Sequence, residues 1–177
     1  MVTRGYLDEP GKTAAAFDDE GYYRTGDLAV FNDPHRPEAG LAFAGRLAEE
    51  FKLSSGAWVY GGALRDALIK ALSPLVTDVV LCDENRPYLA LLVWPSKDGT
   101  CETIAHALAA FNATQQGGSS TICRALLLDE PPSANAHEIS DKGTINRRAV
   151  IDRRGDAVVR LYAENPDANI IILGDKH

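Results

Sequence analysis

Apolar residues recur every three or four positions in three stretches of the chain, a spacing that predicts amphipathic helices. These stretches cover residues 63–72, 102–112 and about 144–163. Their apolar stripes comprise Leu64, Leu68 and Leu72; Ile104, Leu108 and Phe111; and Val150, Ile151, Ala157, Val158, Leu161 and Tyr162. Arg154 falls in the middle of the third stripe, so its charge must pair, reach solvent or face another body.

Short runs of apolar and β-branched residues predict strands at residues 28–31, 41–44, 50–54, 76–82, 88–94 and 122–128. Residues 32–40 form a long polar loop, so the first two strands are expected to pair as a hairpin. The pentapeptide DENRP at 83–87 predicts the turn of a central hairpin. Residues 170–173 are expected to form a short apolar tail.

From about residue 50 the predicted order is β, α, β, β, α, β, α. This order indicates an α+β domain, with helices flanking a mostly antiparallel three-stranded sheet. Residues 1–20 contain too few apolar side chains to bury a core alone. We therefore expect a short β-rich remnant of a larger domain over residues 1–46, followed by a small domain over residues 47–177.

The charge balance argues against nucleic acid as a partner. The 177 residues include 18 Lys and Arg against 25 Asp and Glu, which gives a net charge of −7. No apolar run approaches the roughly 20 residues of a membrane span. The three cysteines show no CxxC spacing, and no histidine lies at ligand spacing from another ligand, so we expect no metal site and a cytoplasmic location.

Two polar residues stand beside glycines at the predicted ends of strands. Asp27 follows Gly26, and its carboxylate could accept hydrogen bonds from paired ligand hydroxyls, such as those of ribose. It could equally cap its own turn. Arg46 follows Gly45 and could present its planar guanidinium to sugar or phosphate oxygens, or form a surface ion pair.

Lys142 lies in the sequence SDKGT, residues 140–144, directly before the third predicted helix. A flexible lysine at the start of a helix is well placed to meet an anion. The alternative is a solvated loop lysine. The glycine spacing and the Lys-Gly order differ from those of a Walker phosphate loop.

Together these segments resemble three motifs of the adenylate-forming superfamily, which includes acyl- and aryl-CoA synthetases, peptide-synthetase adenylation domains and luciferases. GYYRTGDL at 21–28 resembles its YRTGD motif, and DKGTINR at 141–147 resembles its C-terminal lysine motif. Gly45 and Arg46, followed by Lys52 and Gly56, resemble its hinge motif. Residues 48–59 and 138–150 look most like feruloyl-CoA synthetases.

The resemblance implies a role for each matching residue. Asp27 and Arg46 would bind the ribose of ATP or AMP, and Lys142 would be the catalytic lysine between the substrate carboxylate and the α-phosphate. The hinge would be formed by Ala48, where the family often has Asp or Lys, and Glu49. After the C-terminal domain rotates, its other face would serve the thioester step, with Lys52 and Gly56 on that face.

The same resemblance assigns residues 1–46 to the tail of the N-terminal adenylation core and residues 47–177 to the mobile C-terminal domain. The family's phosphate loop, acid pocket and magnesium ligand do not occur in this sequence. We therefore expect a C-terminal fragment of an ATP-dependent carboxylate–CoA ligase, similar to feruloyl-CoA synthetase. Its partners would be ATP, Mg²⁺, CoA, a small aromatic or acyl carboxylic acid and the missing N-terminal domain.

Two alternatives remain open from the sequence. The chain could be a non-catalytic binding or interaction domain on the same scaffold. It could also belong to a ligase that loads the phosphopantetheine of a carrier protein in place of free CoA.

Overall fold

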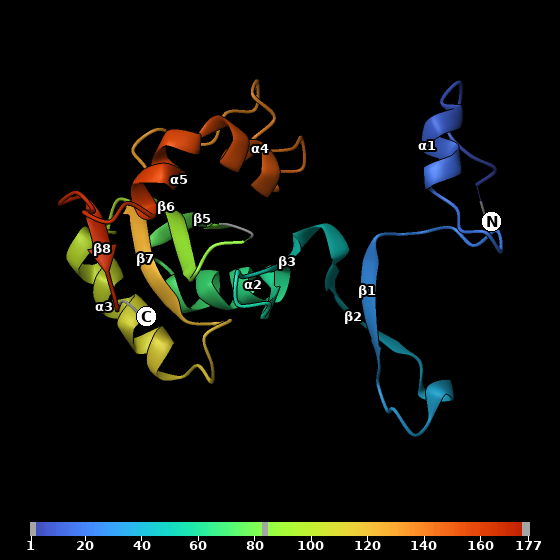
Figure 1. The fold of residues 1–177 in the computed structure, drawn as a ribbon, viewed down its shortest axis with the longest axis horizontal. Coiled ribbons are helices and arrows are strands. Elements are labelled where there is room, and N and C mark those ends of the chain that lie inside the picture. The colour runs from blue at the N-terminus through green and yellow to red at the C-terminus, as the bar shows by residue number, and fades with distance from the viewer. Residues whose placement is uncertain (1–2, 83–84, 175–177) are drawn as a thin grey trace. The chain divides into compact units, whose positions relative to one another are not determined.

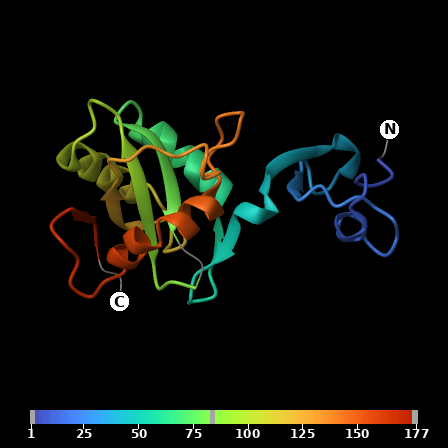
Figure 2. The same cartoon turned by 90° about the horizontal axis from the view of Figure 1, so that it is seen from above.

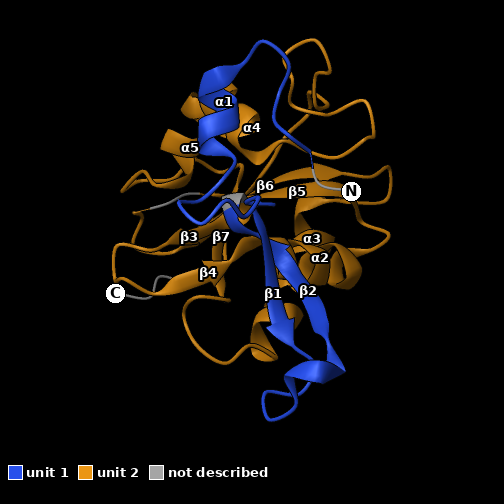
Figure 3. Ribbon diagram, turned by 90° about the vertical axis from the view of Figure 1, so that its right-hand side faces the viewer, with its two compact units in different colours: residues 1–48 blue, residues 49–177 orange. Residues whose placement is uncertain are grey.

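The computed structural model describes residues 3–82 and 85–174, and it divides into two compact units. The first unit is Met1–Ala48 and the second is Glu49–His177 (Figure 3). All the buried hydrophobic residues among those described lie in the second unit, from Phe51 onward. The hydrophobic core therefore belongs to the second unit.

The first unit contains a helix and a two-stranded hairpin. Helix α1 spans Pro10–Ala15, and strands β1 (Asp27–Phe31) and β2 (Leu41–Arg46) pair antiparallel. A short 3₁₀ helix, η1, occupies Pro37–Ala39 in the connecting loop. The predicted hairpin with a long loop is confirmed. Its apolar side chains are between 50% and 69% exposed at Val30, Phe31, Leu41 and Phe43.

The second unit is built on a four-stranded sheet. The strands are β5 (Val76–Cys82), β6 (Leu89–Pro95), β7 (Ile122–Leu127) and β8 (Ile170–Ile172), in that spatial order. The β5–β6 and β7–β8 pairs are antiparallel. The β6–β7 pair is parallel, because the chain between them crosses over as a helix.

Four helices cover the two faces of this sheet, and Figures 1 and 2 show them on opposite sides. Helices α2 (Gly61–Leu72) and α3 (Cys101–Ala113) pack with the face that includes Val79 and Leu81. Helices α4 (Arg147–Arg153) and α5 (Gly155–Leu161) pack with the face that includes Val80 and Cys82. Alternate residues of one strand thus enter two separate apolar clusters, as strand geometry requires.

A short segment precedes the sheet. The 3₁₀ helix η2 spans Leu47–Glu49, and strands β3 (Glu50–Lys52) and β4 (Trp58–Tyr60) form an antiparallel hairpin. Phe51, Leu53 and Val59 of this hairpin join the core beneath α2 and α3. Strand β4 was not predicted, although its aromatic and β-branched residues favour a strand.

The α+β class and the mostly antiparallel sheet are confirmed, but the sheet has four strands where three were expected. Residues 170–172, interpreted as an apolar tail, pair with β7 and bury two isoleucines against it. Three successive β-branched residues suit such an edge position. The predicted turn at 83–87 joins β5 to β6, although residues 83 and 84 lie outside the described ones.

The third predicted helix is wrong in its start and in its continuity. It begins at Arg147, since Ile145 is held in a bridge with Ile139, and the Asn146 side chain accepts the helix-capping bond from Ala149. It breaks at Arg154, which is followed by Gly155, a poor helix former. The inward-facing charge of Arg154 that the sequence indicated is paired at this break.

Two glycines, each at the first position of a helix, test how closely the helix start packs against its neighbours. A Cβ on Gly61 would overlap the carbonyl oxygen of Glu49, whereas a Cβ on Gly155 would meet no atom within 4 Å. We expect Gly61→Ala to lower the free energy of unfolding by roughly 1–3 kcal/mol through overpacking. Gly155→Ala should raise it by roughly 0.4–1 kcal/mol. Urea unfolding of both variants followed by tryptophan fluorescence measures this, and equal effects would contradict the packing at Gly61.

Candidate functional site

The two residues expected to bind ribose face each other across the β1–β2 hairpin. The strand register places Asp27 directly opposite Arg46, and Arg46 Nε lies 2.9 Å from Asp27 Oδ1. Just beyond this pair, the Leu47 N–H donates to the Gly26 carbonyl at 2.8 Å, and Gly26 adopts a φ of 73°. Glycine reaches this left-handed region without steric cost, so it lets the strand turn directly before Asp27.

This ion pair is accessible to a ligand. The Asp27 side chain is 38% exposed and that of Arg46 is 60% exposed. An exposed pair of this kind contributes about 0–1 kcal/mol, so ligand groups can replace either partner at little cost. The Asp27 backbone N–H bonds Thr25 Oγ1 at 3.1 Å, while its carboxylate turns to Arg46. The carboxylate is therefore directed at a cation across the hairpin instead of capping its own turn.

Lys142 lies at the tip of a second, tighter hairpin. The Ser140 N–H donates to the Thr144 carbonyl at 2.9 Å, and the Gly143 N–H donates to the Ser140 carbonyl at 2.8 Å. Gly143 has a φ of 78°, which is typical of a three-residue hairpin loop that ends in a bulge. The Lys142 side chain is exposed, and within residues 3–82 and 85–174 it forms no ion pair.

The placement of Lys142 at a helix N-terminus was wrong. The residues that run back from the turn, including Ile145, separate it from α4, which begins at Arg147. The reason is that Thr144 and Ile145 pair back across the turn and cannot join the helix. Lys142 is thus carried by a hairpin tip and not by the first turn of a helix.

Lys52 and Gly56 belong to the β3–β4 hairpin, whose turn has the same construction. The Leu53 N–H donates to the Ala57 carbonyl at 3.0 Å and the Gly56 N–H to the Leu53 carbonyl at 2.9 Å, with a φ of 80° at Gly56. Lys52 Nζ lies 4.6 Å from the centre of the Trp58 ring, within range of a cation–π contact. Trp58 is 50% exposed, so this pair forms part of the surface.

The expected hinge residues, Ala48 and Glu49, end the 3₁₀ helix η2. The side chain of Ala48 lies outside what the structure describes. A Cβ on Gly62 would overlap Glu49 Oε2, so the Glu49 carboxylate lies against the first turn of α2. That turn has no acidic residue of its own and no side-chain cap. The negative charge of Glu49 is therefore favourable at the positive end of the helix.

A cleft inside the second unit lies between Glu49 and the hairpin of residues 139–145 that carries Lys142, here called the lysine hairpin. Its lining residues are Glu49, Gly61, Arg65, Val80, Leu81, Thr144, Ile145 and Arg147. Arg147 closes one side, because its Nε donates to the Leu81 carbonyl at 2.9 Å and its guanidinium lies 4.4 Å from the Phe51 ring centre. Glu49 thus lies close to Thr144 and Ile145 of the lysine hairpin. Asp27 and Arg46 belong to the first unit.

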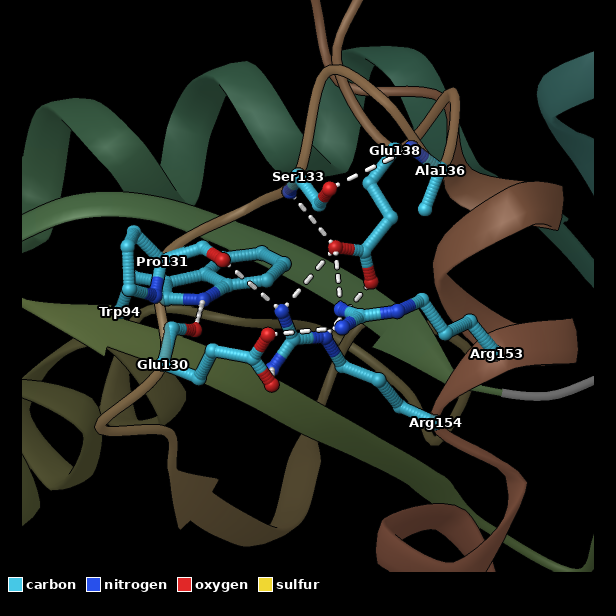
Figure 4. A network of polar contacts seen from close by, with 8 residues as sticks. All are labelled: Trp94, Glu130, Pro131, Ser133, Ala136, Glu138, Arg153 and Arg154. Atoms are coloured by element: carbon cyan, nitrogen blue, oxygen red, sulfur yellow. Dashed lines mark hydrogen bonds and ion pairs between the residues drawn. The ribbon is translucent and has the colours of Figure 1, made fainter.

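A buried charge network was missed in the sequence (Figure 4). Glu138 is 0% exposed and Arg154 is 9% exposed. Arg154 donates from Nε to Glu138 Oε1 at 2.7 Å and from Nη2 to Oε2 at 3.0 Å. Arg153 Nη1 and the Ser133 N–H donate to Oε2 at 2.9 and 2.7 Å. The only sequence signal was Arg154 itself, a charge in an apolar stripe.

Electrostatics keep this carboxylate ionised. Burial acts to raise the pKa of Glu138, but the hydrogen bonds from Arg154 and Ser133 and the charges of both arginines hold it below its usual value of 4.5. The pKa of Glu50, next to Glu49 in the chain, is shifted in the opposite direction. Burial and the neighbouring charge of Glu49 raise the pKa of Glu50, and its Oε1 has no partner among the described atoms.

Two features are absent from residues 3–82 and 85–174. No three His, Cys, Asp or Glu side chains gather there in a way that could hold a metal ion. Within the same ranges, none of the helices has the length and apolar character needed to cross a membrane.

Comparisons with known proteins show similarity over most of the chain. A sequence profile of the AMP-binding enzyme C-terminal domain matches residues 51–166. The carboxylic acid reductase of Segniliparus rugosus is 30% identical over 174 residues, which cover 92% of this chain and 14% of the reductase. The long-chain-fatty-acid–CoA ligase heimdall of Drosophila melanogaster is 31% identical over 93 residues, which cover 52% of this chain and 13% of the ligase.

A solved structure extends the likeness to the fold. The A-PCP didomain of the Segniliparus rugosus reductase, in complex with AMP, matches with a TM-score of 0.74 and 27% identity. The match covers 90% of this chain and 23% of that chain. This chain spans about a seventh of the length of the reductase and ligase that it matches.

Acid should weaken the second unit through Glu138. Because its folded pKa is lowered, its ion pairs stabilise the fold fully above the unfolded pKa of 4.5 and lose that effect as the pH falls through the folded pKa. Removing one partner of a buried pair costs roughly 3–5 kcal/mol. We expect Glu138→Gln to lower the free energy of unfolding at pH 7 by about that amount. Between about pH 7 and 3, its free energy of unfolding, measured with urea, should fall less steeply than that of the wild type.

Glu130→Gln is the matched control, because Glu130 pairs with the same Arg153 but is 62% exposed. It should keep most of the wild-type stability and acid dependence. Parallel pH profiles for wild type and Glu138→Gln would contradict the role given to this carboxylate.

Proposed function

Because the chain belongs to the family of AMP-binding enzyme C-terminal domains, we propose that it is the C-terminal part of an ATP-dependent acid–thiol ligase. The enzyme adenylates a carboxylic acid and then transfers the acyl group to the thiol of CoA. Residues 1–46 would end the adenylation core, and residues 47–177 would form the mobile C-terminal domain. The cysteine pattern favours a cytoplasmic location.

The observation that carries this proposal is the pairing of Asp27 with Arg46 on adjacent strands. The pair places a carboxylate acceptor beside a planar guanidinium donor, and both are exposed, so that a ligand can replace the contact between them. Ribose needs an acceptor for its two hydroxyl groups, and Asp27 supplies one on release from Arg46. Arg46 then donates to the sugar oxygens. The AMP bound in the matching reductase structure supports a nucleotide as this ligand.

Lys142 would act in the adenylation step. A carboxylate oxygen of the acid bonds to the α-phosphorus of ATP as the bond from that phosphorus to pyrophosphate breaks. Negative charge is shared among the attacking, leaving and equatorial oxygens, and a cation placed among them stabilises the transition state. Lys142 fits this task because it is exposed at a hairpin tip and has no competing carboxylate among the described residues.

The thioester step would use the β3–β4 hairpin. The thiol attacks the acyl carbon of the adenylate, and AMP leaves with the electrons of the acyl–oxygen bond. Ala48 and Glu49 would form the pivot that brings this hairpin, with Lys52 and Gly56, to the reacting groups. Magnesium would neutralise phosphate charge in the first step, and we assign its ligand to the adenylation core outside this chain.

For the acid, we propose an aromatic carboxylate similar to ferulate, on the resemblance of residues 48–59 and 138–150 to feruloyl-CoA synthetases. A carrier-protein thiol is a second candidate acceptor, favoured by the PCP domain in the matching reductase structure. Assaying the full-length protein with CoA and with a carrier protein separates these acceptors. A full-length protein that forms no adenylate from any carboxylic acid would favour a non-catalytic binding domain.

Asp27→Asn should weaken nucleotide binding in the full-length protein. It removes the charge that accepts the ribose hydroxyls, and a hydrogen bond to a charged group is worth about 1.5–3 kcal/mol. We therefore expect the Kd for AMP to rise by roughly 10- to 100-fold in calorimetry. Asp33→Asn is the control, since Asp33 also pairs with an arginine on the same hairpin, Arg36. An unchanged Kd in Asp27→Asn would contradict the ribose assignment.

Lys142→Ala should slow adenylation far more than thioester formation. Removal of one group that stabilises developing charge typically costs about 100- to 1,000-fold in rate. ATP–pyrophosphate exchange measures the first step, and release of AMP from a preformed acyl-adenylate on adding CoA measures the second. Lys97→Ala, another surface lysine of the second unit, serves as the control. Equal losses in both steps would count against the assigned role.

A further inference from the structure

The hairpin that carries Lys142 lies in a stretch without regular secondary structure. Between the end of β7 at Leu127 and the start of α4 at Arg147, the chain contains no helix or strand, only the single bridge between Ile139 and Ile145. Backbone pairing alone therefore does not fix this hairpin to the rest of the unit. Its orientation must depend on side-chain contacts at its base.

Glu138 is the residue at that base. Its carbonyl accepts a hydrogen bond from the Asn146 N–H at 2.8 Å, just outside the Ile139–Ile145 bridge. Its own N–H donates to the Ser133 carbonyl at 3.0 Å. Glu138 and Asn146 thus close the hairpin from both sides, and Lys142 lies midway between them in sequence. A rotation at Glu138 would be transmitted directly to the lysine.

The Glu138 carboxylate anchors this base to the folded body. Figure 4 shows both oxygens directed at the guanidinium groups of Arg153 and Arg154, at the junction of α4 and α5. Arg154 also donates to the Pro131 carbonyl at 3.0 Å and lies 5.3 Å from the ring centre of Trp94 in β6. The hairpin is therefore tied to both the helical layer and the sheet.

Stability alone does not require such an arrangement. Well-packed apolar residues of similar volume commonly stabilise a protein as much as a buried ion pair or more. What the charges add is direction, because a two-pronged arginine–carboxylate contact holds one relative orientation of its partners. Apolar contacts allow the hairpin to slide, whereas four hydrogen bonds to one carboxylate do not.

We propose that Glu138 is a positioning residue for Lys142: its buried contacts with Arg153 and Arg154 hold the lysine hairpin in the orientation that adenylation requires. This inference rests on the proposed function. A misplacement of about 1 Å can cost up to 100-fold in rate, so an intact lysine on a loosened hairpin would be a poor catalyst. Glu138 does not contact the reacting atoms and acts through Lys142.

The test uses the full-length protein with Glu138→Gln, an isosteric change that removes the charge. We expect kcat for ATP–pyrophosphate exchange to fall by about 10- to 100-fold, with the KM for ATP unchanged. Thioester formation from a preformed acyl-adenylate should stay at the wild-type rate. Glu130→Gln is the matched control, because it touches Arg153 but not the hairpin, and it should leave both steps unchanged.

A double variant separates positioning from general loosening of the fold. If Glu138 acts through Lys142, adding Glu138→Gln to Lys142→Ala should cause no further loss of exchange activity. Additive losses, or equal losses in both steps, would overturn the proposal. Should Glu138→Gln fail to fold, Arg153→Gln removes a single bond to Glu138 Oε2 and leaves the Arg154 contacts. It should lower exchange more than Glu130→Gln does, and equal rates would also overturn the proposal.

The catalytic role of Lys142 and the positioning role of Glu138 can be disproved separately. If Lys142→Ala leaves exchange unchanged, the catalytic assignment of the lysine is wrong, and the positioning role is overturned with it. If Lys142→Ala abolishes exchange while Glu138→Gln and Arg153→Gln retain wild-type rates, only the positioning role is wrong.

Discussion

Burial of the central sheet on both faces is the constraint on which the second unit depends. All six residues Leu89–Trp94 of β6 are buried, so neither face of the strand can be left to solvent. Two helical layers are therefore needed. Helices α2 and α3, which precede β7 in the chain, form one layer, and α4 and α5, which follow it, form the other. The second layer is short, and its packing brings Arg154 inward with α4 and α5.

An inward arginine in turn requires a buried anion. Glu138 supplies it from the loop between β7 and α4. The second helical layer covers the sheet, its inward arginine requires a buried carboxylate, and the loop that supplies this carboxylate is thereby attached to the fold. These dependencies explain how a stretch without regular secondary structure acquires a fixed base beneath the exposed tip that carries Lys142.

Much of the fold could be predicted because its signals are local. Leu64, Leu68 and Leu72 mark α2 by spacing alone, and the buried strands β5, β6 and β7 are marked by β-branched and apolar runs. Strand β8 could not be predicted, since three isoleucines become a strand only when the edge of β7 is available. The break at Arg154 comes directly before Gly155, a poor helix former, and the apolar period that continues on both sides does not register it.

In the candidate site, too, single residues could be predicted from local motifs, whereas their contacts could not. Asp27, Arg46 and Lys142 stand in recognisable local motifs, so the sequence indicated each of them singly. The contact between Asp27 and Arg46 depends on strand register over an intervening loop. The pairing of Glu138 with Arg154 joins residues 16 apart through a break in a helix, and no spacing rule points to it.

The two hairpins that carry Lys142 and Lys52 share one turn design, three residues closed by a glycine with positive φ. Such turns have few alternative conformations, and each loop is too short to bend independently of its strands. Neither lysine can therefore be withdrawn or advanced by a change in its own loop. An exchange of one for the other at a common target would therefore require a rigid-body rotation of the whole unit.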